Sequence, residues 1–131
     1  EKTNWVNKRK WLLDSLVDIL KTDTADGISK GLMLSQKLSA DPDIINDAIA
    51  IMKTFFRDLM IFQFHPKKIV NLDFSDVFAD IGLRFEITQR DEWIRQLFET
   101  EKRIAANSTI RLTLERFFLK IATHKGNMIY D

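Results

Sequence analysis

The chain has 131 residues, a length typical of one domain that can bury a proper hydrophobic core. Its 20 lysines and arginines against 19 aspartates and glutamates give a formal net charge of +1, so the strong basic excess of a dedicated nucleic-acid binder is missing. Because it contains no cysteine, the composition excludes a disulfide framework, a thiolate metal site and a cysteine nucleophile.

The sequence shows neither the apolar run of ~18 residues that a membrane span needs nor a signal-peptide pattern. We therefore expect a soluble protein of the cytoplasm with no membrane partner. With 4 glycines and 2 prolines the chain has few turn-forming residues, which favours long regular elements. It begins with Glu1 rather than methionine, so we expect a fragment of a longer protein.

The first third of the sequence predicts two helices. Apolar residues at helical spacing indicate a helix from Trp5 to Leu20, and the polar stretch 22–27 is typical of a turn. A shorter helix is expected from about Ile28 to Leu38. Gly31 lies inside it, where glycine costs ~1 kcal/mol relative to alanine, so we interpret this glycine as a mark of close helix packing.

The stretch from Asp41 to Phe64 predicts the helix around which the others are organised. Asp41 can cap its first turn, Pro42 suits the first helical position, and His65 with the proline after it should end the helix. The apolar arc is wider than a surface helix needs, so we expect neighbours on two sides, with Asp58 at the edge of a thin polar strip. The central stripe consists of Ile45, Ala48, Met52, Phe55, Leu59 and Phe62.

After an extended apolar bridge at 69–72, the sequence predicts a short helix. Asp73 is placed as its N-cap, and Leu72 and Val77 are placed to form a hydrophobic staple. Gly82 can end this helix with a residue in the left-handed conformation.

Two longer helices follow. Thr88, three residues before Asp91, resembles a capping box and opens a helix to about Ala106. The polar pair 107–108 can cap a last helix that runs to about Ala122. The expected core residues of these two helices are Ile94, Leu97, Phe98, Ile104 and Ala105 in the first, and Ile110, Leu114, Phe117, Phe118 and Ile121 in the second.

Six helical segments with short connections, without a strand signal or an internal repeat, predict the fold class. We expect an all-α, compact bundle of about five to six helices that forms a single domain over residues 1–131. Its 10 phenylalanines and 3 tryptophans exceed what a small bundle needs. Since aromatic residues are enriched at protein interfaces, we expect some of them to lie in one.

Motifs that carry chemistry are missing from the sequence. It contains no phosphate-binding loop pattern, and His65 and His124 do not have metal-ligand spacing. No triad of nucleophile, base and acid can be assembled from sequence order. We therefore expect no catalytic residues, no metal and no cofactor in this segment.

Charged residues near the apolar faces offer a structural role instead. Arg57 and Asp58 lie in the middle of the central helix, and Arg111 and Glu115 lie one turn apart on the last helix. Both pairs are placed to fix helices or subunits by charge-assisted hydrogen bonds. The alternative is a surface ion pair that stabilises the fold by about 0 to 1 kcal/mol.

Three short motifs resemble a known family in order and spacing. They are FFRDLM from Phe55 to Met60, IVNLD from Ile69 to Asp73, and NSTIRLTLERFFL from Asn107 to Leu119. Together they resemble the C-terminal helical domain of the delta-prime subunit of the bacterial DNA polymerase III clamp loader. The resemblance extends over most of the chain, from about Trp5 to His124.

The resemblance can be followed residue by residue. Thr109 and Ile110 depart from the family pattern, which has a second asparagine and a proline at these positions, so the turn geometry there does not transfer. The matching residues of the first and last motifs are Phe56, Arg57, Asp58, Leu59, Asn107, Arg111, Leu112 and Glu115. The candidate interface or structural residues are Phe56, Arg57, Asp58, Asn71, Asn107, Arg111 and Glu115.

The resemblance implies a non-catalytic oligomerisation domain. In such loaders the C-terminal domains of five subunits form a collar that holds the assembly together for sliding-clamp loading in DNA replication. ATP binding, the arginine finger and the zinc module lie in upstream domains, and the parent holoenzyme is the DNA-directed DNA polymerase. The implied partners are the gamma/tau-type and delta-type subunits, with DNA contacted only indirectly through the full complex.

Three other readings remain open from the sequence. The chain could be the collar domain of a gamma/tau-type subunit, or an enzyme with a polar site in the bundle core. It could also be a small helical nucleic-acid-binding domain, for which a steep salt dependence of DNA binding would be diagnostic. The cations of that third reading are Lys8, Arg9, Lys10, Lys67 and Lys68.

Overall fold

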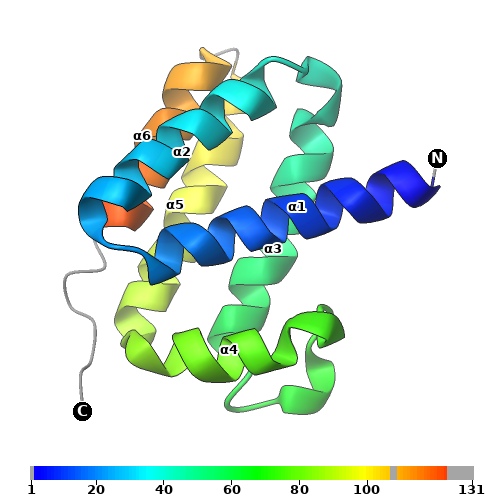
Figure 1. The fold of residues 1–131 in the computed structure, drawn as a ribbon, viewed down its shortest axis with the longest axis vertical. Helices are drawn as coiled ribbons and strands as arrows, with labels where there is room; N and C mark the ends of the chain where they lie inside the picture. Colours follow the sequence, from blue (N-terminus) through cyan, green and yellow to red (C-terminus); the bar gives the residue numbers. More distant parts are fainter. Residues whose placement is uncertain (1, 107–108, 124–131) are drawn as a thin grey trace.

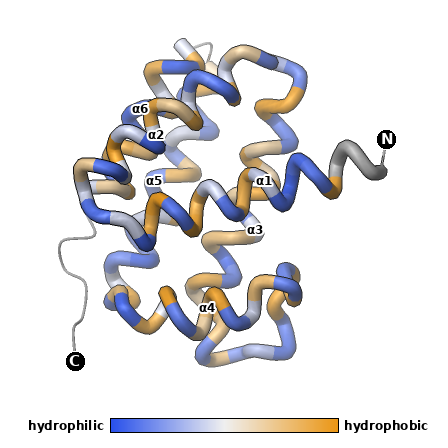
Figure 2. The backbone as a smooth tube through the Cα atoms, viewed as in Figure 1, coloured by the Kyte–Doolittle hydropathy of each residue, from blue (hydrophilic) through white to orange (hydrophobic). Residues whose placement is uncertain are grey.

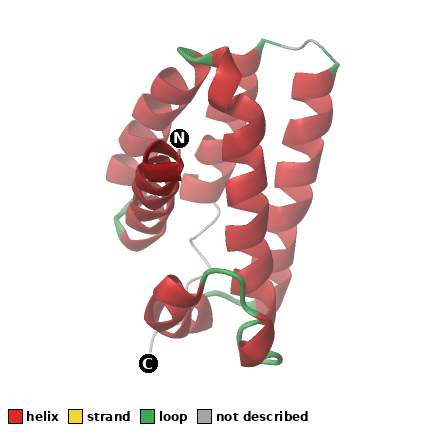
Figure 3. Cartoon of the chain, turned by 90° about the vertical axis from the view of Figure 1, so that its right-hand side faces the viewer, coloured by secondary structure: helices red, strands yellow, loops and turns green. Residues whose placement is uncertain are grey.

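The computed structural model describes residues 2–106 and 109–123, with side chains from Val6 onward. All regular structure in these residues is helical, without a strand, which confirms the predicted all-α bundle (Figure 3). Apolar and polar residues alternate along the helices, as expected where one face is buried (Figure 2). The α-helices are α1 (Lys2–Lys21), α2 (Thr24–Ser39), α3 (Ile45–Ile61), α4 (Ser75–Ile81), α5 (Ile87–Ala105) and α6 (Ile110–Thr123) (Figure 1).

Helix α3 is the hub that the sequence predicted. It contacts α1, α2 and α5, and α1 crosses it in Figure 1. Phe55 packs against Phe78 of α4, and Phe56 packs edge-on against Phe117 of α6. The whole central stripe is buried, as are Ile49 and Ile51 beside it. A wide apolar arc therefore lets one helix contact all the others described.

The bounds of α3 differ from the prediction at both ends. Residues Pro42–Ile44 form a 3₁₀ turn, and the carboxylate of Asp41 caps this turn by accepting from the N–H of Asp43 at 3.1 Å. At the other end α3 stops at Ile61, whose carbonyl oxygen accepts from the N–H groups of Phe64 and His65. The helix thus ends before His65 and Pro66, and the turn that follows it pairs the N–H groups of Phe64 and His65 with the carbonyl oxygen of Ile61.

Helix α2 begins earlier than predicted and packs closely on α6. The carboxylate of Asp23 accepts from the N–H of Asp26 at 2.8 Å, so Thr24 starts the helix and most of the predicted turn is helical. A Cβ atom on Gly31 would lie 2.9 Å from the Cβ of Phe118. This contact confirms that Gly31 marks close packing, and the two helices lie side by side in Figure 1.

The expected N-cap at Asp73 is wrong. Leu72–Phe74 form a 3₁₀ turn, and α4 begins at Ser75 without a side-chain cap. The carboxylate of Asp73 pairs with Arg9 of α1 instead, which a local reading of the sequence could not show. Leu72 is exposed, so the expected hydrophobic staple with Val77 is not supported.

Gly82 does not adopt the left-handed conformation expected of it. Its φ is −62°, and the chain continues into a 3₁₀ turn over Gly82–Arg84. A Cβ atom at this position would lie 2.5 Å from Cε1 of Phe62. Gly82 is therefore explained by a tertiary contact and not by helix termination.

The core face of α5 was predicted only in part. Glu86 precedes its first residue, Ile87, and makes no side-chain cap, so the capping box at Thr88 is wrong. Leu97 is buried as expected, whereas Phe98 and Ala105 are exposed. The buried face consists of Arg90, Trp93, Leu97 and Thr100.

Of the apolar stripe expected on α6, Ile110 is partly buried, and the other four residues, Leu114, Phe117, Phe118 and Ile121, are buried. The proposed caps at positions 107 and 108 lie outside the described residues. In the described part of the chain, no helix combines the length and the apolar character needed to cross a membrane.

Candidate functional site

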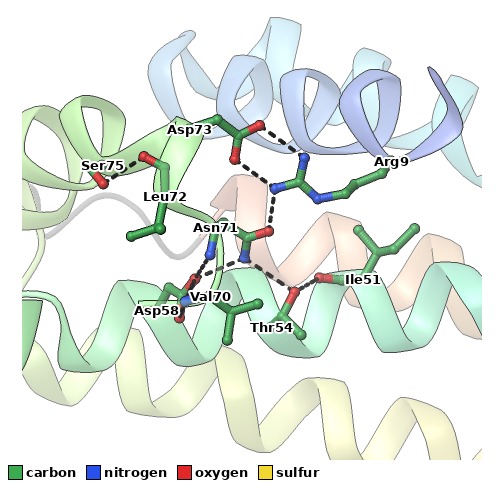
Figure 4. Close-up of polar contacts among 9 residues, drawn as sticks. All are labelled: Arg9, Ile51, Thr54, Asp58, Val70, Asn71, Leu72, Asp73 and Ser75. Atoms are coloured by element: carbon green, nitrogen blue, oxygen red, sulfur yellow. Dashed lines mark hydrogen bonds and ion pairs between the residues drawn. The ribbon is translucent and has the colours of Figure 1, made fainter. Parts of the chain in front are cut away.

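A buried carboxylate on α3 organises a polar cluster that joins three parts of the chain (Figure 4). Asp58 has no exposed side-chain surface. Its Oδ2 accepts hydrogen bonds from the backbone N–H of Val70 at 3.1 Å and of Asn71 at 2.8 Å. It also accepts from Nδ2 of Asn71 at 2.8 Å. These donors compensate the burial of the charge and fasten the bridging segment to the hub helix.

Asn71 extends this cluster to a second helix. Its Nδ2 also donates to Oγ1 of Thr54 at 3.2 Å, and its Oδ1 accepts from Nη2 of Arg9 at 2.6 Å. Arg9 in turn binds the carboxylate of Asp73 with both terminal nitrogens, at 2.8 and 2.9 Å. We call Arg9, Thr54, Asp58, Asn71 and Asp73 the Asp58 cluster. It joins α1, α3 and the segment that leads into α4.

The electrostatics of the cluster match this geometry. The hydrogen bonds from Arg9 lower the pKa of Asp73, and the same bonds raise the pKa of Arg9. Both groups therefore stay charged at neutral pH. Each member is engaged by a neighbour within the cluster. The arrangement is suited to holding three chain segments together.

The other residues of the first motif have different environments. Phe56 is a core residue that packs against Phe55, Trp93 and Phe117. The Arg57 side chain is 46 % exposed, and its Nη1 lies 3.3 Å from both the Asp58 carboxylate and the carbonyl oxygen of Lys68. Phe56 is thus structural, while the Arg57 side chain is about half exposed at the surface.

The last motif does not join the Asp58 cluster. Arg111 and Glu115 form an i,i+4 ion pair of 3.2 Å on the outer part of α6. Because both side chains are partly exposed, this pair matches the surface alternative considered for it. Asn107 lies outside the described residues.

Sequence reasoning missed the contacts of two arginines, one partly buried and one buried. Arg9 was considered as a solvated surface cation or a phosphate contact, yet it completes the Asp58 cluster. Arg90 is 4 % exposed and donates to the carbonyl oxygen of Leu59 at 2.9 Å and to Oε1 of Gln63 at 2.6 Å. The spacing of Arg90 with Trp93 and Leu97 along α5 is the signal that could have placed it on the buried face.

No candidate metal site is present among the described residues. Across residues 2–106 and 109–123, no group of three or more histidine, aspartate or glutamate side chains is arranged to hold a metal ion. The chain matches no known protein-family profile, no curated protein and no solved structure.

Proposed function

We propose that this chain is the non-catalytic collar domain of a bacterial DNA polymerase III clamp-loader subunit, of the delta-prime type. It binds gamma/tau-type and delta-type subunits in the cytoplasm and holds the loader together while the sliding clamp is placed on DNA. ATP hydrolysis belongs to upstream domains of the loader, and DNA is contacted through the full complex.

The contact between Asp58 and Asn71 carries this proposal. The two residues belong to two of the motifs that resemble the family, and they lie 13 positions apart in the chain. A buried carboxylate needs donors, and the buried Asn71 amide needs an acceptor, so each residue accounts for the other. The contact joins two of the three motifs into one structural unit, which supports treating them together.

Exposed apolar side chains supply surface for partner subunits. Leu112 and Leu119 are exposed on α6, and Phe98 is exposed on α5. The two leucines are seven positions apart, which places them on one face of α6 about two turns apart. A contact in a standing complex buries on the order of 1,000 Å² or more with an apolar centre, and side chains of this kind form such centres.

The nucleic-acid alternative loses part of its support in the structure. Of its five cations, Arg9 is paired with Asp73 and Lys10 with Asp14. These two charges are already compensated, so fewer remain to release counterions from a phosphate backbone. The overall charge of +1 adds no further attraction.

Co-assembly with purified subunits tests the proposal. The chain is mixed with the gamma/tau-type and delta-type loader subunits of its own organism and separated by size-exclusion chromatography. We expect co-elution, and we expect excess chain to displace the full-length delta-prime subunit from a reconstituted loader.

A variant and a DNA titration sharpen this test. Replacing both Leu112 and Leu119 with glutamate should weaken co-elution while the helical circular-dichroism signal is kept, because both side chains are exposed. Elution of the unaltered chain apart from all loader subunits would overturn the proposal. DNA binding by the isolated chain that falls steeply with added salt would favour the nucleic-acid alternative.

A further inference from the structure

A surface hollow of about 460 Å³ opens where α3 ends and α5 begins. Both helix ends lie at the lower end of the molecule in Figure 1. The lining of this hollow includes Phe64, Leu83 and Ile87, which are 57, 55 and 41 % exposed. Phe64 also lines an adjoining hollow of about 360 Å³ together with Lys67 and Lys68. Since one side chain borders both hollows, they form a continuous surface, which we call the Phe64 groove.

The Phe64 groove carries uncompensated positive charge. Lys67 and Lys68 are exposed and form no ion pair with any residue in the described part of the chain. Arg90 lines the same surface, and its hydrogen bonds to Leu59 and Gln63 involve neutral oxygens. Its Nε is buried without a partner among the described residues.

One acid borders this surface. Glu86 lines the larger hollow and is the single carboxylate among the described residues that line the two. The lining of the two hollows thus holds three cations, Lys67, Lys68 and Arg90, against one carboxylate, so the groove has a net positive charge although the whole chain is nearly neutral. Most other arginines in the described residues are paired with a carboxylate, as Arg84, Arg95 and Arg103 are. The charge excess is therefore local.

These features define the chemistry of an occupant. Three exposed apolar side chains around a hollow are unfavourably hydrated. Covering them with an apolar surface of a partner lowers the free energy. Unpaired cations at the rim attract carboxylates and repel basic segments, which selects among partners. Burial without a counter-charge lowers the pKa of Arg90, and a nearby carboxylate would relieve this cost.

We propose that the Phe64 groove binds an acidic, apolar segment of another clamp-loader subunit. The segment places apolar side chains against Phe64, Leu83 and Ile87 and carboxylates beside Lys67 and Lys68. This inference rests on the proposed function and specifies which surface of the domain meets its partner and what the partner presents.

Photo-crosslinking in the assembled loader tests the groove. Phe64 is replaced with p-benzoylphenylalanine, and Met33, an equally exposed apolar residue of α2 that does not line the groove, receives the same replacement as a control. Each variant is assembled with the purified gamma/tau-type and delta-type subunits, irradiated, and analysed by mass spectrometry. We expect the crosslinker at position 64 to capture a partner segment that contains apolar residues and more carboxylates than cations.

A second variant tests the charges. With Lys67→Glu and Lys68→Glu added, the yield of that crosslink should fall by about fivefold or more, because repulsion replaces attraction at the rim. The loader could assemble while position 64 crosslinks to nothing, to a basic segment or to another copy of this chain. Any of these results would refute binding of an acidic partner segment in the groove, and the proposed function would still stand. Failure of the chain to assemble with any subunit would overturn both.

Discussion

The carboxylate of Asp58 accepts two hydrogen bonds of 2.8 Å from Asn71, one from the backbone N–H and one from the side-chain amide. This contact holds the bridging segment at 69–71 against the middle of α3. Asn71 passes the connection to Arg9 and hence to α1. One buried acid thus fixes the relative positions of three segments that are far apart in the sequence.

Removing this acid should strongly destabilise the domain. Asp58→Ala leaves the N–H groups of Val70 and Asn71 and the Asn71 amide without their acceptor inside the protein. We expect the free energy of unfolding to fall by about 3 to 5 kcal/mol. Urea denaturation with an unchanged m-value measures this loss. Asp91→Ala, which removes an exposed ion pair with Arg95, is the matched control and should cost about 1 kcal/mol or less. Equal effects of the two changes would contradict the structural role of Asp58.

The pairing of Arg9 with Asp73 should make stability depend on pH in the acid range. Because the native pKa of Asp73 lies below its unfolded value, the unfolded chain binds more protons between the two values, and the contribution is lost as pH falls through the native pKa. Asp73→Asn should therefore be less stable than the parent above about pH 4 and equally stable well below it. Since the Asp73 side chain is 57 % exposed, solvent screening limits the difference to about 1 kcal/mol. Urea midpoints from pH 2 to 7 measure it, and a difference that persists at the lowest pH would refute this assignment.

Gly82 and Phe62 should be energetically coupled. Gly82→Ala places a methyl group against the Phe62 ring, so we expect a loss of about 1 to 3 kcal/mol despite the higher helix propensity of alanine. Phe62→Leu removes the ring atoms that a Cβ at position 82 would meet. In a double-mutant cycle, the loss of unfolding free energy in the double variant should be smaller than the sum of the two single losses by about 1 kcal/mol. Additive losses would mean that the two residues do not share this contact.

Arg57 should matter more for assembly than for stability. Its side chain is 46 % exposed, and its two hydrogen bonds are long at 3.3 Å, so Arg57→Ala should reduce the free energy of unfolding by about 1 kcal/mol or less. If this arginine contacts a neighbouring subunit, affinity for the loader should fall by about tenfold or more, since arginine is enriched among the residues that dominate binding. Thermal denaturation and a pull-down with purified subunits separate the two effects. Arg95→Ala is the control for an exposed arginine, and unchanged affinity of Arg57→Ala would count against an interface role.

Several elements could be predicted because their signals are local. The spacing of Ile45, Met52, Phe55 and Leu59 identified the buried face of α3, since helical periodicity depends only on neighbouring residues. Gly31 was recognised as a packing position because glycine destabilises a helix interior relative to alanine, which close packing can compensate. Asp58 and Asn71 were both among the candidate residues, although the contact between them was not predicted.

Other predictions were wrong where a residue had two possible environments. Asp73 has the right chemistry for a helix cap, but the guanidinium of Arg9 offers two charge-assisted hydrogen bonds in its place. Phe98 fits an apolar stripe, yet Trp93 and Leu97 occupy the buried face of α5 and leave Phe98 exposed. Competition of this kind is decided by three-dimensional neighbours.

The sequence by itself determined that this chain is helical, where most helices run and which face of α3 is buried, because each depends on residue types within a few turns. The tertiary structure alone decided that Asp58 is buried and fully hydrogen-bonded, that the Phe62 ring packs against Gly82, and that Arg90 lies beside an apolar groove. Each of these depends on groups far apart in the chain, whose hydrogen bonds and packing exist only once the helices have come together.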